Sequence, residues 1–299
     1  MVSVIIPTYN RPEMLVTALR SVLAQTYRDL EVIVVDDCSR EPAADVLNRY
    51  FAEEMRTGTV RSLRNETNKD KSFSRNRGVA QARGAWLAFL DDDDEWLPMH
   101  LRVLVDLAAE HPDCRILFSN FTEVKSGAVV GTGQTISCGG GKAVRDLCIR
   151  GVIGNVCYTL MDKDLFSRCG GFDERLDVYE DRLLLATAAL HTEVYFSETK
   201  TLKHVIHDGS FSFRSGSAAM ARSKAFVADE IVARARSAGY RIEPKDMREM
   251  YLNVCMQMSD DRGTALKYWR KALRSDPTGL LSVSCWRALV RALFFGGSR

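Results

Sequence analysis

Four consecutive carboxylates, Asp91 to Asp94, directly follow an apolar run over residues 85–90. That run is typical of a buried strand, so the acids lie where the strand leaves its sheet. In extended chain, side chains two residues apart point the same way, about 7 Å from each other. Two like charges about 6 Å apart repel by about 3 kcal/mol at an effective dielectric constant near 20. A divalent cation such as Mg²⁺ or Mn²⁺ relieves this repulsion, and a solvated acidic turn is the alternative.

Two further polar clusters follow predicted strands. The apolar run over residues 2–6 ends at Pro7, Thr8 and Tyr9, and the run over residues 31–35 ends at Asp36 and Asp37. Ligands of open α/β sheets bind beyond the carboxyl ends of the strands, so we expect all three clusters at one edge. The sequence contains no glycine-rich phosphate loop after the first strand and no P-loop motif, which argues against a dinucleotide dehydrogenase or a P-loop NTPase.

These clusters are positioned by alternating strands and helices. Strand-like runs cover residues 2–6, 31–35, 59–63, 85–90 and 115–119, and helical spacing covers residues 12–23, 42–51, 72–83 and 98–110. This alternation predicts an α/β fold whose central sheet is mostly parallel and flanked by helices on both faces. Asn10 is expected to cap the first helix, and Ser72 or Ser74 the third.

The second half of the chain has a different pattern. Residues 120–141 are rich in Gly, Ser and Thr and predict a long surface excursion, followed by strands near 155–161, 193–196 and 202–206 and a helix over 180–190. We expect a domain over residues 1–215, with a nucleotide-binding half (1–119) and an acceptor-side half (120–215), and a C-terminal helical region over 216–299.

Composition excludes several classes of protein. The net charge of +2 over 299 residues gives no electrostatic signature of a nucleic-acid partner. The eight cysteines form no C-x-x-C pair, which favours small buried thiols in a reducing compartment. No apolar run approaches 18 residues and no signal peptide is visible, so we expect a cytoplasmic protein.

Five motifs in order resemble the family 2 glycosyltransferases, which have the GT-A fold. They cover roughly residues 1–215 and comprise residues 2–11 (VSVIIPTYNR), 34–39 (VVDDCS), 75–78 (RNRG) leading to 89–94 (FLDDDD), 170–174 (GGFDE) and the Glu180-Asp181 pair. The resemblance implies a nucleotide-sugar donor, with a UDP-sugar as the default, a bound Mn²⁺ or Mg²⁺, and inversion at the anomeric carbon.

The resemblance also implies roles for individual residues. In the nucleotide site, Pro7 and Tyr9 flank the nucleoside and Asp37 accepts a hydrogen bond from the base. The remaining nucleotide contacts are expected from Thr8, Lys71, Arg75, Asp91 and Asp92.

The metal and the general base complete the expected site. Asp93 is expected to bind the metal with Asp91, and His207 to complete the metal shell. Asp181 is expected to be the general base for the acceptor hydroxyl. Glu180 is the less favoured base, since neighbouring helical side chains point about 100° apart.

Several alternatives stay open at this point. A nucleotidyltransferase would also need carboxylates and a metal, and a non-catalytic nucleotide-sugar binder would need only the donor site. Cys38 and Arg182 depart from the family pattern, where glycine and an aromatic residue are common. The acceptor is a glycan, a lipid-linked sugar or another hydroxyl compound.

The end of the chain carries an apolar stripe of Trp286, Leu289, Val290, Leu293 and Phe294. This stripe predicts a helix packed on the core, a homodimer interface, or peripheral contact with the cytoplasmic face of a membrane.

Overall fold

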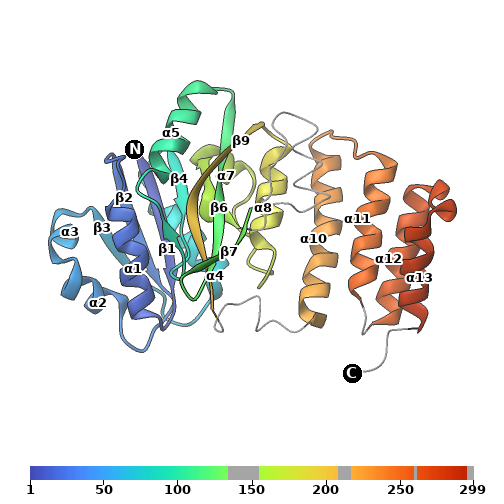
Figure 1. Ribbon diagram of the computed structural model, residues 1–299, viewed down its shortest axis with the longest axis horizontal. Helices are drawn as coiled ribbons and strands as arrows, with labels where there is room; N and C mark the ends of the chain where they lie inside the picture. Colours follow the sequence, from blue (N-terminus) through green and yellow to red (C-terminus); the bar gives the residue numbers. More distant parts are fainter. Residues whose placement is uncertain (134–154, 208–216, 259–260, 295–299) are drawn as a thin grey trace. The chain divides into compact units, whose positions relative to one another are not determined.

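The computed structural model describes residues 1–133, 155–207, 217–258 and 261–294. They form two compact units, an α/β unit that ends at residue 207 and a helical unit that begins at residue 217 (Figure 1).

A nine-stranded mixed sheet is the centre of the α/β unit. Its first four strands are parallel and have the order β3 (Val60–Arg64), β2 (Leu30–Asp36), β1 (Val2–Thr8), β4 (Trp86–Phe89). Thr8 pairs with Asp36, and Ile5 pairs with Phe89. The chain therefore leaves these strands at one edge of the sheet, as the sequence predicted.

The sheet continues with strands of both directions. Next to β4 lie β8 (Thr159–Asp162), β6 (Cys114–Lys125), β9 (Glu193–Ile206) and β5 (Glu95–Trp96), while β7 (Ala128–Thr132) pairs with β6. Strand β8 is antiparallel to both β4 and β6, and β9 is parallel to β6.

Two predictions about this region were wrong. Residues 120–132 belong to β6 and its hairpin with β7 rather than to a surface excursion, and the rest of the predicted excursion lies outside the described residues. The two short strands expected after residue 193 are one strand, β9. The pairing of β6 with β9 extends to Lys125 and Ile206. Backbone hydrogen bonds between the two strands therefore stabilise these polar ends as strands, although their sequences lack the alternating apolar pattern of a typical strand.

Helices flank this sheet. Their bounds are α1 (Pro12–Leu23), α2 (Ala43–Tyr50), α3 (Ala52–Thr57), α4 (Asp70–Ala80), α5 (His100–Glu110), the 3₁₀ turn η2 (Val156–Tyr158), α7 (Lys163–Arg168) and α8 (Glu180–Ala189). Helix α4 packs against β1 and β2. A Cβ atom on Gly78 would lie 2.5 Å from Ile5 Cγ2, so only glycine permits this close helix–strand contact.

The predicted caps of α1 and α4 were wrong. Asn10 has a positive φ of 55°, and its Oδ1 accepts a hydrogen bond from the backbone N–H of Arg40 instead of capping α1. Helix α4 begins at Asp70, before either predicted serine cap. At α4 the Asp37 carboxylate, from the loop after β2, accepts the backbone N–H groups of Lys69 and Asp70 in place of a local cap, whereas the N-cap residue of α1, Arg11, makes no side-chain capping hydrogen bond.

The helical unit consists of α10 (Ser217–Ser237), α11 (Pro244–Gln257), α12 (Arg262–Ser275), η3 (Pro277–Leu281) and α13 (Val283–Phe294). Helix α11 packs against α10, α12 and α13, and α12 also packs against α13. Among the described residues, no helix combines the length and apolar character needed to cross a membrane.

Candidate active site

The ends of β1 and β4 are tied together by the second and third acids of the loop at residues 91–94, which we call the acidic loop. The Thr8 hydroxyl donates to Asp92 Oδ2 over 2.7 Å. Arg11 Nη1 lies 2.9 Å from Asp92 Oδ1 and 2.8 Å from Asp93 Oδ2. Burial raises the pKa of Asp92 to about 6, although Arg11 opposes the shift. Arg11 therefore compensates part of the charge of the acidic loop.

The four acids alternate between outward and inward positions. The side chains of Asp91 and Asp93 are 28% and 18% exposed, whereas those of Asp92 and Asp94 are 6% and 1% exposed. Residues 91–94 form a turn in which the backbone N–H of Asp94 donates to the Asp91 carbonyl over 3.1 Å, so this alternation does not come from the extended chain that the sequence predicted. The outward pair can meet a ligand, while the inward pair is held by contacts within the protein.

Two histidines of β9 and its end lie against the acidic loop. His207 Nε2 is 3.1 Å from Asp93 Oδ2. His204 Nδ1 is 3.0 Å from Asp94 Oδ1, which also accepts the backbone N–H of Val205 over 3.0 Å. Burial acts to lower the pKa of His204. The hydrogen bond to Asp94 and the negative charge of Asp94 outweigh burial and raise the pKa of His204 to about 9. His204 is therefore a cation at neutral pH.

The predicted donor set of Asp91, Asp93 and His207 has ligand types that suit Mn²⁺ or Mg²⁺, although the described residues whose ligand atoms all lie within 4.8 Å of one another are Asp91, Asp94 and Cys157. Carboxylate oxygens suit both ions, and an imidazole nitrogen suits a borderline ion such as Mn²⁺. Asp93 and His207 already converge within hydrogen-bonding distance, and both outward carboxylates reach the surface.

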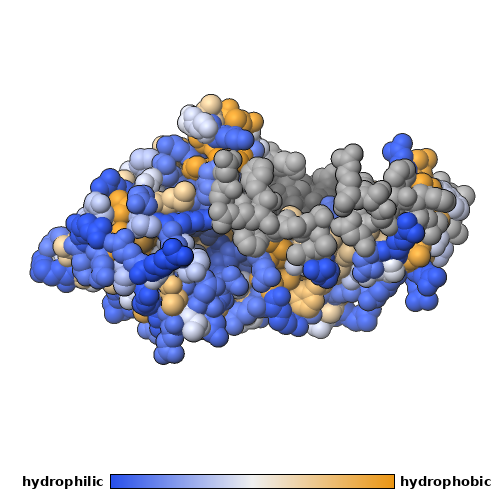
Figure 2. Space-filling model, turned by 90° about the horizontal axis from the view of Figure 1, so that it is seen from below, coloured by the Kyte–Doolittle hydropathy of each residue, from blue (hydrophilic) through white to orange (hydrophobic). Residues whose placement is uncertain are grey.

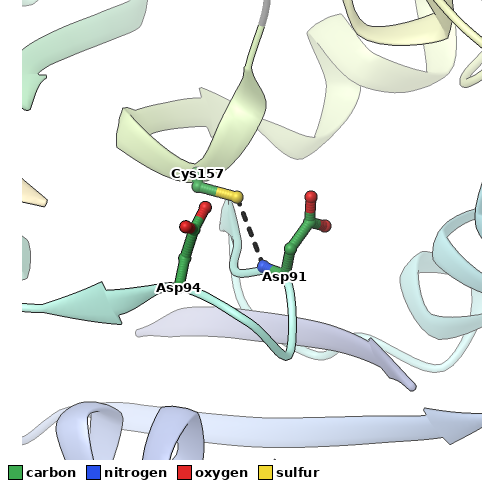
Figure 3. A group of neighbouring side chains, drawn as sticks. All are labelled: Asp91, Asp94 and Cys157. Carbon is green, nitrogen blue, oxygen red and sulfur yellow. Dashed lines mark hydrogen bonds between the residues drawn. The ribbon is translucent and has the colours of Figure 1, made fainter. Parts of the chain in front are cut away.

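A buried thiol lies between two acids of the loop (Figure 3). Ligand atoms of Asp91, Asp94 and Cys157 lie within 4.8 Å of one another, and the backbone N–H of Asp91 donates to Cys157 Sγ over 3.2 Å. Burial raises the pKa of this thiol well above its usual value, and Asp91 and Asp94 raise it further. The thiol is therefore protonated and a poor metal ligand at neutral pH, since metals bind the thiolate.

Asp37, at the end of β2, is held at the base of α4. Its carboxylate accepts hydrogen bonds from Asn65 Nδ2 over 2.7 Å and from the backbone N–H groups of Lys69 and Asp70, each over 2.9 Å. A carboxylate has about four acceptor positions, so one remains for a further donor. The adjacent Cys38 has a φ of 67°, a conformation that explains why glycine suits this turn.

Arg75 connects the acidic loop to the start of α8. Its buried guanidinium donates to Asp91 and, over 2.8 Å, to Glu180 Oε1. Lys71 Nζ also lies 2.8 Å from Glu180 Oε1. Burial acts to lower the pKa of Arg75, but Asp91 and Glu180 outweigh burial and raise it. Burial likewise acts to raise the pKa of Asp91, but Arg75 and Lys71 lower it overall.

Asp181 differs from the other acids of the site. It is buried, and its Oδ1 accepts the backbone N–H of Arg182 over 2.6 Å. Burial, followed by the negative charge of Glu180, raises the pKa of Asp181 to about 7. A carboxylate with a pKa near neutrality can accept and return a proton at physiological pH.

An open pocket of about 420 Å³ adjoins the ends of β1 and β2. It is lined by Thr8, Asn10, Arg11, Pro12, Ser39, Arg40, Glu41, Ala43 and Val46. Its size and its place at the carboxyl edge of the sheet suit a small ligand.

Comparison with known proteins identifies the family. Residues 3–129 match the sequence profile described as Glycosyl transferase family 2. This matched part of the chain is a family 2 glycosyltransferase segment. An uncharacterized glycosyltransferase of Haemophilus influenzae is 31% identical over 190 residues, which are 60% of this chain and 59% of that protein.

A second relative of this chain has a stated reaction. The Escherichia coli protein WfgD, named as a UDP-Glc:alpha-D-GlcNAc-diphosphoundecaprenol beta-1,3-glucosyltransferase, is 29% identical over 131 residues, 44% of this chain and 49% of WfgD. The chain thus spans about six-tenths or less of the length of both relatives.

Two solved structures share the GT-A fold with this chain. Residues 1–349 of Staphylococcus aureus TarS superpose with a TM-score of 0.65 at 19% identity, covering 92% of this chain and 88% of theirs. The Pyrobaculum calidifontis mannosyltransferase PcManGT, solved with GDP-Man and Mn²⁺, gives a TM-score of 0.60 at 18% identity, covering 98% and 84%.

The fold collects most of the residues predicted for the site. Direct contacts link Thr8 to Asp92, Asp93 to His207, and Asp91 through Arg75 to Glu180. Pro7 lies at the end of β1 and the exposed Tyr9 follows it. Their roles in binding and catalysis stay predictions.

Sequence reasoning missed Arg11 and His204. Arg11 lay inside the first motif, next to residues that were singled out, but no sequence signal paired it with acids 81 and 82 residues away. His204 precedes His207 by three residues, and only the pairing of the β9 region with the acidic loop gives it a partner.

Proposed function

We propose that this protein transfers a sugar from a nucleoside-diphosphate donor to an acceptor hydroxyl, with inversion at the anomeric carbon. Two contacts carry the proposal: Asp93 lies beside His207, and Arg75 bridges Asp91 to Glu180 at the start of α8. Metal-binding groups for the leaving diphosphate and a base for the acceptor are the two requirements of this reaction.

The donor site is proposed at the carboxyl edge of β1, β2 and β4. Asp37 retains one acceptor position for an N–H of the base, and Pro7 and Tyr9 flank the nucleoside. Lys71 and Arg75 supply positive charge near the diphosphate, and Asp92 holds the loop after β1 through Thr8. A UDP-sugar is the proposed donor, because the same TarS fragment has also been solved with UDP-GlcNAc.

Asp91, Asp93 and His207 would hold the proposed Mn²⁺ or Mg²⁺. The bound metal would stabilise the negative charge that develops on the departing diphosphate. PcManGT, which shares the fold, was solved with Mn²⁺ and a nucleotide sugar. Asp92, through its contact with Thr8, and Asp94, through its contact with His204, stabilise the conformation of the acidic loop.

Asp181 is the proposed general base, with its pKa near 7. It takes the proton of the acceptor hydroxyl as the oxygen attacks the anomeric carbon, and the bond to the nucleoside diphosphate breaks on the opposite side. Glu180 is less suited, since Lys71 and Arg75 both contact its Oε1. The proposed acceptor is a hydroxyl of a lipid-linked glycan, the class named for WfgD.

The direct test is donor consumption with a panel of nucleotide sugars and lipid-linked acceptors, with and without Mn²⁺. Wild-type protein should consume one donor in the presence of metal, and proton NMR of the product should show inversion. Asp93→Asn should reduce turnover by about a hundredfold or more, as expected when charge stabilisation of a leaving group is lost.

The matched control is Asp106→Asn, at an exposed acid of α5 that pairs with Arg102. This variant should turn over like wild type. Retention of the sugar's configuration, or full activity of Asp93→Asn, would contradict the proposal.

A further inference from the structure

The outer side of α13 exposes apolar residues at helical spacing. Val283, Trp286 and Val290 are exposed, while Cys285 and Ala288 on the opposite side are buried in the unit. Trp286 is 52% exposed, whereas Trp86 and Trp269 are half-buried and Trp96 is buried. A large exposed aromatic side chain on an amphipathic helix suits the interface between water and lipid headgroups.

The same part of the chain is strongly basic. Residues 262–299 contain eight Lys or Arg and one acidic residue, although the whole chain carries only +2. The single acid, Asp276, forms an ion pair with Arg248. The positive charge of this segment is therefore largely uncompensated within it.

Basic side chains and the apolar stripe lie on neighbouring helices. Lys267, Arg270 and Arg274 are exposed along one side of α12, and Arg287 is exposed next to Trp286 on α13. Helices α12 and α13 pack together, and Trp269 Nε1 donates to the Cys285 carbonyl over 3.1 Å. In Figure 2, hydrophobic and strongly hydrophilic residues lie side by side at the end of the view that holds these helices.

We propose that this surface, the α12–α13 face (Lys267, Arg270, Arg274, Trp286, Arg287 and Val290), binds the headgroups of an anionic lipid bilayer. Basic residues meet the anionic headgroups, and the Trp286 and Val290 side chains enter the interface. A second copy of the chain fits less well, because a two-fold interface would bring the same positive surface against itself. The proposal goes beyond sugar transfer and does not depend on it.

The experiment is co-sedimentation of the full chain with sucrose-loaded vesicles, without donor or acceptor. Vesicles of phosphatidylglycerol mixed with phosphatidylethanolamine should carry the protein into the pellet, whereas phosphatidylcholine vesicles should not. Raising the salt concentration should release the protein, since salt screens attraction between exposed charges. Each basic residue near an anionic surface contributes about a fivefold change in partitioning.

Matched variants separate the face from general surface effects. Trp286→Ser and the pair Arg270→Gln with Arg274→Gln should each reduce sedimentation by about tenfold or more. Tyr50→Ser changes another aromatic side chain that is 52% exposed, and Arg56→Gln removes an exposed charge from α3; both should sediment like wild type. Circular dichroism melting should show that all variants stay folded.

Three outcomes would overturn the proposal. In the first, the wild-type protein stays in the supernatant with anionic vesicles. In the second, the Trp286→Ser variant sediments like wild type. In the third, light scattering shows a dimer that Trp286→Ser abolishes, and neither protein binds lipid. Since the experiment measures no sugar transfer, a negative result does not affect the proposed reaction. Conversely, a protein that binds vesicles but transfers no sugar would still support lipid binding by the α12–α13 face.

Discussion

The acidic loop after β4 and the acidic start of α8 both bury carboxylates, but they compensate the charge differently. In the loop, Arg75 meets Asp91, Arg11 meets Asp92 and Asp93, and His204 meets Asp94. At α8, Lys71 and Arg75 both meet Glu180, and within the described residues no ion pair reaches Asp181.

This difference separates two kinds of carboxylate. In the loop, Arg75 and Lys71 lower the pKa of Asp91, whereas burial raises the pKa of Asp92 to about 6 and raises that of Asp94 even though each has a basic partner. An unpaired buried acid favours its protonated form, and the pKa of Asp181 rises to about 7. The same residue type can thus bind a cation in one region and exchange a proton in the other.

The largest effect is expected from Asp181→Asn. The amide cannot accept the acceptor proton, so turnover should fall by about a thousandfold while donor affinity stays close to wild type. Rapid-quench turnover and calorimetric donor binding would measure the two quantities. A parallel loss of donor affinity would indicate that Asp181 positions the donor instead.

Breaking the bridge between the two regions should destabilise the fold. Arg75→Gln removes the cation shared by Asp91 and Glu180, which leaves buried carboxylates without their partner. The free energy of unfolding should fall by about 3 to 5 kcal/mol, as measured by urea denaturation. Arg102→Gln, which breaks an exposed pair with Asp106, should change it by less than about 1 kcal/mol.

The pH dependence of stability should distinguish the two regions. Between pH 4 and 7 the Asp181 carboxyl holds its proton in the folded protein but releases it when unfolded, so its contribution to stability falls as pH rises. Asp181→Asn should flatten this part of the melting-temperature curve. Wild-type activity should rise with pH through about 7. Identical curves for wild type and variant would contradict the raised pKa.

A smaller effect is expected at the inward side of the loop. His204→Asn keeps a hydrogen-bond donor near Asp94 but removes the positive charge, which lies three residues before His207. Mn²⁺ affinity, measured by electron paramagnetic resonance, should weaken by about tenfold, because the His204–Asp94 contact fixes the loop that carries Asp93 and so orients that ligand indirectly. His111→Asn, at a histidine stacked on Tyr195, should leave Mn²⁺ affinity unchanged.

The parallel half of the sheet was largely predictable from sequence. Continuous apolar strands between amphipathic helices leave one arrangement in which both faces of the sheet are covered, and that arrangement brings Thr8, Asp37 and Asp91 to one edge. The strand form of residues 120–132 and the continuity of β9 through residues 197–201 were not predictable, since both rest on pairing between distant segments.

The sequence by itself determined the kind of chemistry: acids at strand ends, in an order typical of family 2. Only the tertiary structure decided which acid acquires which partner. Arg75 reaches Asp91 and Glu180 across 16 and 105 residues, and His204 reaches Asp94 across 110. A side chain's pKa and exposure depend on what is packed around it, and those neighbours come from elements that the chain order does not place next to each other.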